Sequence, residues 1–497
     1  KNLDTNKAQG PDNIPARLLK ETATEIAPSL CALFNKSLRV GVLPSDWKIA
    51  NVVPVHKHGE KTYVENYRPI SLLCLISKVL ERCIFNNIKY RIYEQLNPCQ
   101  HGFMPGKSCV TQLIEVLDQL GRELDRGKQI DVLYLDMSKA FDKVSHAELI
   151  HRLREFGFGG HILQWFGSYL TNRYQQTTVL GATSRPVPVT SGVPQGSILG
   201  PLLFLLYENH LPDVVTNSKI ATFADDTKIF KTIESSSDAS ALQDDLTKFE
   251  KISTNINLGL NPRKCKVLRV TRKRNKIVHP YKLHHTILEY TDCERDLGIL
   301  TSSDLTWSKH VEYQCTKATK ALGFVRRMTL NIKDIAIRRT LYLSLVRSQL
   351  CYGSQIWAPQ TVTLIKQAER TQRRATKYVL DLPFRCDTIY QQRLLLLDLI
   401  PLCYWHEFLD IVLFYKIIHG HVIIDTNLLP STTNNNRRET RSSDTDHLKF
   451  STNRCKTTTY QKSYLNRTTR LWNILPKELT GINISLTQFK SGLYKYY

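Results

Sequence analysis

Three aspartates in two separate segments are the residues of this sequence best suited to chemistry. Asp225 and Asp226 are adjacent, between two apolar, β-favouring arms in Ile220-Ala-Thr-Phe-Ala-Asp-Asp-Thr-Lys-Ile-Phe230. This pattern predicts a β-hairpin with both acids at its tip. Asp136 ends the short apolar run Ile130-Asp-Val-Leu-Tyr-Leu-Asp136, which predicts a strand. An isolated Asp-Asp pair is most often a solvated turn, so its interpretation depends on the residues that accompany it.

Three carboxylates brought together repel one another unless a cation neutralises them. Such a set can hold two divalent ions over a phosphoryl group, where they activate an attacking 3′-hydroxyl and stabilise a leaving pyrophosphate. The reaction needs no protein nucleophile, because positioning and charge neutralisation carry most of the catalysis. Two Mg²⁺ ions, with Mn²⁺ as an alternative, are therefore expected at Asp136, Asp225 and Asp226.

The composition favours a polyanionic partner. Lys and Arg outnumber Asp and Glu by 68 to 45, a formal net charge of +23, which indicates nucleic acid first and an acidic membrane second. No apolar run is long enough to span a membrane, and no signal peptide opens the chain. The 12 cysteines contain no C-x-x-C pair, so we expect reduced, mostly buried thiols in an intracellular protein and no zinc site. Because the chain begins with Lys1, we expect a piece of a longer polyprotein.

The elements that must position the acids follow from apolar periodicity. The pattern predicts strands over 47–55, 267–270 and 295–300, helices over 29–40, 77–96, 108–124, 202–207 and 235–255, and helix, loop, helix over 146–180. From about residue 308 helix follows helix, over 308–329, 333–352 and 360–380, with a leucine-rich pair over 388–420. Asp142 is expected to cap a helix that starts near Lys143.

Three further segments allow two interpretations each. Ser191–Pro201 has three glycines and two prolines in 11 residues, which suits either close backbone approach or a structural turn, and it matches no phosphate-binding motif. The basic loop Arg272–Lys276 is either a solvated hairpin tip or a nuclear-targeting signal. A cationic stripe at helical spacing suits a solvated helix face or phosphate contact equally, and it consists of Lys366, Arg370, Arg373, Arg374 and Lys377.

Several segments, in order along the chain, resemble the motifs of reverse transcriptases from non-LTR (LINE-like) retrotransposons of the jockey or chicken-repeat type. Tyr134–Asp142, Ser191–Pro201 and Phe223–Asp226 resemble motifs A, B and C. The other matches are Lys7–Asp12 (N-terminal extension), Asn66–Ser71 (fingers), Asn261–Lys264 (motif D) and Asp296–Ile299 (primer grip). The resemblance covers about residues 1–300, and the helical segment to about 380 resembles the thumb region.

The resemblance implies an α+β fold of the right-hand polymerase type, whose palm holds an antiparallel sheet. The implied order is fingers with an N-terminal extension (1–130), palm (131–300) with a fingers insertion (146–190), α-helical thumb and following helices (301–424), flexible linker (425–447) and C-terminal region (448–497). The role of the C-terminal region does not follow from the resemblance.

The implied activity is RNA-directed DNA polymerisation, which joins dNTPs to the 3′-end of a DNA primer or target on an RNA template. Asp136 and Asp225 would ligate the metals with Asp226 beside them, and the Met137 carbonyl would add an oxygen. Phe141 would be the steric gate against a ribose 2′-hydroxyl. The implied nucleotide-binding residues are Lys57, Arg68, Ser138, Lys139, Ala140, Phe141, Gln195, Gly196 and Lys264. Lys264, or its neighbour Lys266, would protonate pyrophosphate, and Leu297 and Gly298 would support the primer.

Two other functions remain open at this stage. An RNA-dependent RNA polymerase shares the two-metal palm, although Phe141 opposes ribonucleotides. A catalytically decayed RNA-binding protein of retroelement origin is the second alternative, which the three intact acids oppose. Compared with the full-length pattern of the family, we expect this sequence to contain neither an endonuclease segment nor a Cys-His knuckle, so target cleavage is not assigned to this chain. The expected location is the nucleus, after a cytoplasmic ribonucleoprotein stage.

Overall fold

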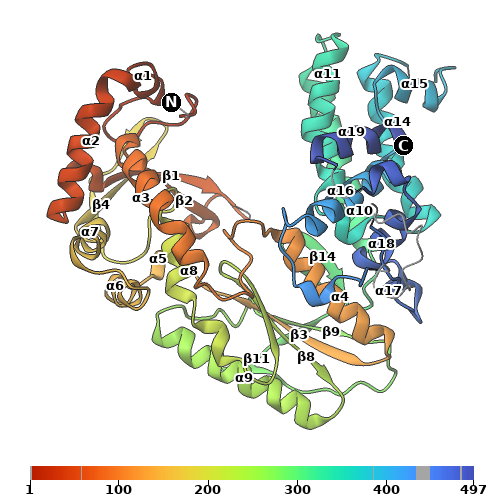
Figure 1. Ribbon diagram of the computed structural model, residues 1–497, viewed down its shortest axis with the longest axis horizontal. Helices are drawn as coiled ribbons and strands as arrows, with labels where there is room; N and C mark the ends of the chain where they lie inside the picture. The colour runs from red at the N-terminus through yellow and green to blue at the C-terminus, as the bar shows by residue number, and fades with distance from the viewer. Residues whose placement is uncertain (1–2, 58, 384, 433–447, 482–483) are drawn as a thin grey trace, which may run out of the picture.

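The computed structural model describes residues 3–57, 59–383, 385–432, 448–481 and 484–497. Two arms rise from a base in Figure 1: an N-terminal arm of helices and a sheet, and a helical arm built by the C-terminal part of the chain. The base contains a five-stranded sheet whose strand order is β12-β9-β3-β8-β7. The fold is thus mixed α and β, as predicted.

Strand β3 (Gln129–Asp136) lies at the centre of the base sheet, antiparallel to both β8 (Asp226–Ile233) and β9 (Lys266–Val270). The edges are β7 (Lys219–Phe223), antiparallel to β8, and β12 (Glu289–Thr291), parallel to β9. Ile130 and Val132 pack with α4 (Cys109–Asp125) on one face, while Leu133 and Leu135 pack with α8 (Gly200–Glu208) and α9 (Ser236–Asn255) on the other. Since successive strand residues face opposite sides, burial of both faces explains the apolar run of β3.

The sheet of the N-terminal arm joins distant segments. Strand β1 (Ile49–His56) pairs antiparallel with β2 (Tyr67–Leu72) and parallel with β4 (Arg173–Val179), and β5 (Ala182–Thr183) and β6 (Val187–Val189) pair with β4. The arm's helices are α1 (Ala16–Glu21), α2 (Ala23–Val40), α3 (Leu75–Tyr93), α6 (His146–Glu155) and α7 (Gly160–Leu170). The predicted second helix over 146–180 therefore ends at Leu170, because the alternating Gln-Gln-Thr-Thr-Val segment that follows completes a sheet.

The helical arm begins after a hairpin of β13 (Cys293–Asp296) and β14 (Ile299–Ser302), which corrects the predicted single strand over 295–300. The short strands β10 (Lys282–Leu283) and β11 (Thr286–Ile287) form a separate hairpin. The arm's elements are α10 (Ser308–Met328), α11 (Ile335–Leu341), the π-helical η4 (Tyr342–Arg347), α12 (Ser348–Cys351), α13 (Ser354–Trp357), α14 (Val362–Val379), α15 (Tyr390–Leu396) and α16 (Leu402–Ile418). The helices predicted from residue 308 onward are present, and that over 333–352 contains a π-helical stretch.

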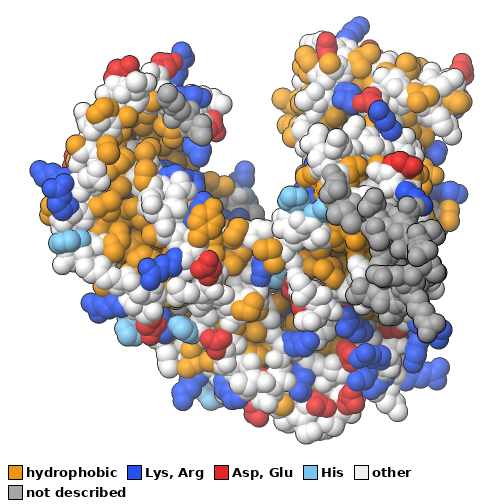
Figure 2. Space-filling view, in the orientation of Figure 1, with side chains coloured by type: hydrophobic (Ala, Val, Ile, Leu, Met, Phe, Trp, Pro, Cys, Tyr) orange, Lys and Arg blue, Asp and Glu red, His pale blue; other side chains and the backbone are white. Residues whose placement is uncertain are grey.

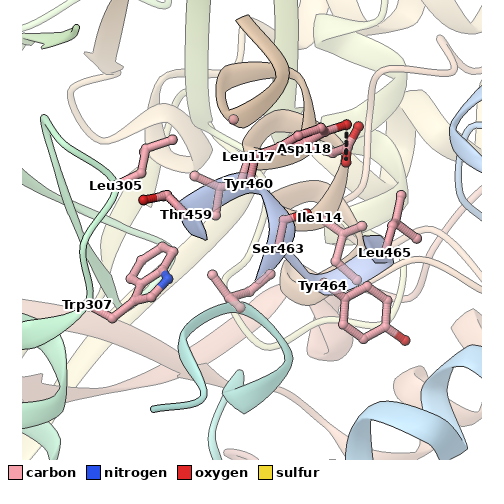
Figure 3. A pocket seen from close by; sticks show the side chains of 12 residues that line it. Ile114, Leu117, Asp118, Leu305, Trp307, Thr459, Tyr460, Ser463, Tyr464 and Leu465 are labelled. Atoms are coloured by element: carbon pink, nitrogen blue, oxygen red, sulfur yellow. Dashed lines mark hydrogen bonds between the residues drawn. The ribbon is translucent and has the colours of Figure 1, made fainter. Parts of the chain in front are cut away.

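The last helices connect the helical arm to the base. Helices α17 (Thr458–Gln461), α18 (Tyr464–Ile474) and α19 (Leu486–Tyr496) follow the predicted linker, of which 433–447 lie outside the described residues. In Figure 3, side chains of α17 and α18 face those of α4 and the segment holding Leu305 and Trp307, around a small cavity of about 40 Å³. The Tyr460 hydroxyl donates to Asp118 of α4 (3.4 Å), and Arg467 of α18 pairs with buried Asp410 of α16 (2.8 Å).

Two sequence expectations concern the chain as a whole. All 12 cysteines lie in described segments and none forms a disulfide, but only Cys74, Cys265 and Cys315 are buried. The expectation of mostly buried thiols is therefore wrong, because many of the cysteines lie on the partly exposed sides of helices. Among the described helices, none combines the length and the apolar character needed to cross a membrane.

Candidate active site

The β7–β8 hairpin presents the adjacent aspartates, as predicted. Phe223 pairs with Asp226, so the tip consists of Ala224 and Asp225, and Asp226 is the first residue of β8. Ala224 has a left-handed backbone with φ of 51°. Across the β3–β8 ladder, Asp136 is the direct partner of Asp226. The fold therefore brings the three acids from two segments to one end of the central strands.

Burial and neighbouring acids disfavour the charged forms of Asp225 and Asp226. Partial burial and then the charge of Asp136 raise the pKa of Asp225, against a smaller opposing effect of Lys57 and Arg68. Partial burial, followed by the charges of Asp225 and Asp296, raises the pKa of Asp226 to about 6, although its side chain remains solvent-exposed. Removal of this repulsion is the electrostatic contribution that a bound divalent cation would make.

The donor set suits a hard cation. The buried Oδ2 atom of Asp136 accepts no hydrogen bond, and the nearest cation is the Lys264 ammonium at 3.5 Å. Carboxylate oxygens are the ligands that Mg²⁺ prefers. As the side chains are placed, no group of three His, Cys, Asp or Glu within the described segments is arranged to hold a metal ion.

The turn after Asp136 is fixed by the segment before β9. The Ser138 N–H donates to the Gly259 carbonyl (3.2 Å), and the Asn261 N–H donates to the Asp136 carbonyl (2.9 Å). Lys139 has a left-handed backbone with φ of 51° and precedes the short helix α5 (Ala140–Lys143). Since the Ser138 N–H is already used, a phosphate cradle here would rest on the N–H groups that follow it.

Phe141 lies in a cluster of aromatic rings. Its ring stacks on buried Phe204 of α8 with centroids 4.2 Å apart, and Phe103 meets it edge-on at 6.2 Å. These contacts restrict the rotamers that Phe141 can adopt, because a stacked ring loses contact area when it turns. The predicted gate residue is therefore held on both sides.

Asp142 does not have the capping role predicted for it. It lies inside α5, and the next helix, α6, is capped by Ser145, whose hydroxyl accepts the Glu148 N–H (3.4 Å). Asp142 instead accepts a hydrogen bond from the Gln195 side chain (2.9 Å). The local pattern missed this contact, which joins the motif A turn to the glycine-rich segment.

The glycine-rich segment is a close-approach loop. A Cβ atom on Gly192 would lie 2.8 Å from the Asp142 backbone, and one on Gly196 would lie 2.6 Å from the Ser71 carbonyl oxygen. Both glycines have positive φ, 87° and 121°. The Ser71 N–H also donates to the Gln195 carbonyl (2.7 Å). The segment thus fits between β2 and the motif A turn. Of the two interpretations of this segment, close backbone approach and a structural turn, the structure supports close backbone approach.

The predicted phosphate-binding cations reach the site from two directions. Lys57 and Arg68 are exposed at the end of the β1–β2 pair where the connecting loop joins the strands, and their charges act on Asp225. Lys264 faces Asp136, whereas Lys266 forms an ion pair with Glu289. Of these two lysines, only Lys264 is therefore directed toward the acids.

The remaining predicted contacts lie in the helical arm and at its base. Leu297 and Gly298 form the β13–β14 turn, where the Leu297 carbonyl accepts the Tyr352 hydroxyl (2.9 Å). On α14, Lys366, Arg370, Arg373 and Arg374 are exposed and Lys377 is half-buried. Glu369 faces inward, where it accepts hydrogen bonds from Tyr390 and the Leu402 N–H. Glu369 therefore does not neutralise the charge of the stripe.

The sequence did not identify Gln100 as a support of the site. Its buried Oε1 accepts the N–H groups of Gly102 (2.6 Å) and Ala224 (2.9 Å), and its Nε2 donates to buried Glu208 (2.8 Å). The backbones of His101 and Thr222 are also hydrogen-bonded (2.9 Å). No local pattern could have revealed this, because the bond from Gln100 to Ala224 spans 124 residues.

A second support is the buried ion pair of Lys228 on β8 and Asp296 on β13, with side chains 2% and 5% exposed. It joins the two hairpins, and the Asp296 carboxylate contributes to the raised pKa of Asp226. The base sheet and the predicted primer-grip turn are therefore connected electrostatically.

The chain is similar to proteins of mobile elements. In Drosophila melanogaster it is 29% identical over 404 residues to the probable RNA-directed DNA polymerase from transposon BS, covering 77% of this chain and 44% of that protein. It is 30% identical over 387 residues to the probable RNA-directed DNA polymerase from transposon X-element (75% and 42%). It is 28% identical over 372 residues to the RNA-directed DNA polymerase from mobile element jockey (71% and 40%). The chain thus spans less than half the length of these relatives.

The family profile described as reverse transcriptase (RNA-dependent DNA polymerase) matches residues 55–318. This range contains all three aspartates, the glycine-rich segment, Lys264 and the β13–β14 turn. The chain therefore belongs to the reverse transcriptase family.

Proposed function

We propose that this chain is the polymerase part of a non-LTR retrotransposon protein and extends a DNA 3′-end with dNTPs on an RNA template. The observation that carries the proposal is the pairing of Asp136 with Asp226 across β3 and β8, with Asp225 at the adjoining tip. Names of relatives that contain "RNA-directed DNA polymerase" support the same chemistry. In this proposal the N-terminal arm is the fingers, the base sheet the palm and the helical arm the thumb.

Two Mg²⁺ ions are proposed at Asp136 and Asp225, with Asp226 beside them and the Met137 carbonyl as a further ligand. When bound, the ions would lower the pKa of the primer 3′-hydroxyl and stabilise the charge on the leaving pyrophosphate. The aspartate side chains would turn toward the ions, which relieves the repulsion that raises the pKa values of Asp225 and Asp226. The rigid β3–β8 ladder would keep their backbones fixed.

The incoming dNTP would lie between the glycine-rich loop and the motif A turn. Lys57 and Arg68 would hold its triphosphate, as would the backbone over Lys139, Ala140 and Phe141. Gln195 and Gly196 would line the nucleotide, and the held Phe141 ring would exclude a ribose 2′-hydroxyl. Lys264 would give a proton to the leaving pyrophosphate, since its ammonium already lies 3.5 Å from Asp136.

The nucleic acid would lie between the arms. Leu297 and Gly298 would support the primer end, and the exposed cations of α14 would contact phosphates. A DNA primer or target places the reaction in the nucleus, after assembly with the RNA in the cytoplasm.

The test is primer extension on an RNA template with dNTPs and Mg²⁺. We expect extension by the wild type and a loss of several orders of magnitude with Asp225→Ala, because an essential metal ligand is removed. Asp244→Ala, at an exposed acid on α9, is the matched control and should extend normally. Normal extension by Asp225→Ala would show that the site is misassigned. Extension with NTPs in place of dNTPs would indicate an RNA polymerase, and RNA binding without any extension would indicate a decayed enzyme.

A further inference from the structure

Three segments meet at the end of the base sheet opposite the catalytic acids. Gln129, which starts β3, exchanges two hydrogen bonds with the Ile277 backbone (2.9 and 3.0 Å) and so holds the loop that follows β9. At the end of α4, Asp125 accepts the Thr457 N–H (2.6 Å) at the start of α17. Arg272 in the loop donates to Thr459 of α17 (2.6 Å). The loop and the C-terminal helices thus form one continuous surface.

This surface is strongly basic. Its cations, called the corner patch here, are Arg272, Lys273, Arg274, Lys276, Arg454 and Lys456. All are exposed except the half-buried Lys273, and no acid occurs between residues 266 and 276. Within the described segments, the ion pairs at the end of α4 use Arg122 of the helix and Arg126 and Lys128 just after it, and none uses the six cations of the patch.

Hydrogen bonds to the base fix the two segments that carry the corner patch. The loop is hydrogen-bonded to Gln129 and the C-terminal segment to Asp125, and residues of α4 and α17 line the same small cavity (Figure 3). Lys and Arg side chains gather at the lower right of Figure 2, where the ends of α4 and β9 lie in Figure 1. The six cations outnumber the neighbouring acid Asp125, whose pKa is lowered in part by the charge of Lys456. Such an excess of like charge favours a polyanion, because phosphates remove the repulsion.

The corner patch is separate from the catalytic site. Gln129 and Asp136 are the two ends of β3, an eight-residue strand. At about 3.3 Å per residue these ends are about 23 Å apart. At about 3.4 Å per nucleotide of a stacked strand, this separation corresponds to about seven nucleotide steps.

We propose that the corner patch binds the phosphate backbone of RNA, and that it holds part of the template outside the catalytic site. This rests on the proposed function, which supplies an RNA partner. Adjacent guanidinium and ammonium groups on two segments match a phosphate chain. An acidic membrane fits less well, because the loop lacks an amphipathic helix and Val278 is its only strongly exposed large apolar residue.

Two pairs of substitutions test the two segments separately. One variant is Arg274→Gln with Lys276→Gln, and the other is Arg454→Gln with Lys456→Gln; Arg272 is left because it bonds to Thr459. The matched control is Lys490→Gln with Lys495→Gln, at two exposed lysines of α19. Affinity for a mixed-sequence RNA carrying one hairpin is measured in excess short primer–template duplex, so that the catalytic site is occupied.

Each patch variant should bind this RNA about tenfold more weakly, and the slope of log K against log salt should fall by about 1.5. The control should match the wild type, and all proteins should extend the short duplex equally. Unchanged RNA affinity and slope in either patch variant would overturn the proposal. So would loss of binding to phosphatidylserine vesicles, or to duplex DNA, without loss of RNA binding. If RNA binding weakens as expected but even the wild type does not extend the short duplex, the RNA-binding role of the patch is supported and the polymerase assignment is refuted.

Discussion

The β7–β8 and β13–β14 hairpins are alike in form but differ in how they are held. Each turns through left-handed residues, Ala224 in the first (φ 51°) and Leu297 and Gly298 in the second (φ 46° and 86°). The first tip is held by the buried side chain of Gln100, and the second by the partly exposed Tyr352 hydroxyl. The hairpin that carries the proposed catalytic acids is thus fixed from the protein interior, whereas the hairpin expected to touch a moving primer is held at the surface.

The largest effect should come from removing the buried ion pair that joins the two hairpins. Lys228→Met leaves the Asp296 carboxylate buried without its partner, so we expect a loss of about 3–5 kcal/mol in the free energy of unfolding. Chemical denaturation at neutral pH measures it. The double variant Lys228→Met with Asp296→Leu should recover most of the loss, because no charge remains buried.

The exposed pair Arg17–Glu21 is the matched control for this experiment, with side chains 76% and 60% exposed. Arg17→Met should leave the free energy of unfolding almost unchanged, because solvent screens the pair. Equal losses from Lys228→Met and Arg17→Met would show that the connection between the hairpins contributes little.

The second prediction concerns Gln100, which supports the tip of the β7–β8 hairpin. Gln100→Ala leaves the Ala224 N–H without its acceptor, and we expect kcat to fall about 100-fold with little change in the KM for dNTP, since small misplacements of reacting groups are costly. Steady-state extension kinetics separate the two constants. Gln100→Glu combined with Glu208→Gln exchanges donor and acceptor, so it should restore much of kcat. A rise in KM alone would contradict a positioning role.

Tyr352→Phe is the corresponding change at the other hairpin. It removes the bond to the Leu297 carbonyl without leaving a buried group unpaired. We expect weaker primer affinity and an unchanged kcat at saturating primer. If Gln100→Ala and Tyr352→Phe altered the same kinetic constant, the two hairpins would not differ in function as proposed.

The contrast also explains what the sequence could predict. The β7–β8 hairpin and β3 were predicted correctly, because their apolar runs and turn residues are local signals. The β13–β14 hairpin was read as one strand, since the apolar residues Leu297, Ile299 and Leu300 conceal the turn at Leu297 and Gly298. Gln100 and the true contact of Asp142 were missed because their partners lie 124 and 53 residues away in the chain. The roles proposed for the site residues rest on the family motifs, because periodicity alone does not assign roles to single residues.

A third prediction tests backbone strain at the second hairpin. Gly298 has φ of 86°, and a Cβ atom there would lie 3.1 Å from the Tyr352 ring. Gly298→Ala should therefore lower the free energy of unfolding by about 1–2 kcal/mol. Leu297→Gly, which relieves the neighbouring left-handed residue, should cost less, as denaturation of both variants would show. A neutral Gly298→Ala would mean that this turn relaxes easily.

The smallest effect concerns the pH dependence of the first hairpin. Partial burial and the charges of Asp225 and Asp296 raise the pKa of Asp226 to about 6 in the folded protein, from an ordinary value near 4. The folded state therefore binds more protons than the unfolded state between these values, so this group destabilises the protein as the pH rises through 6. Without metal, Asp226→Asn should be more stable than the wild type at pH 7, and the advantage should vanish below pH 4. Thermal denaturation in EDTA across this pH range measures the difference in stability between the variant and the wild type. Added Mg²⁺ should reduce this difference by neutralising the wild-type acids. An advantage that does not change with pH would show that repulsion among the acids is not its cause.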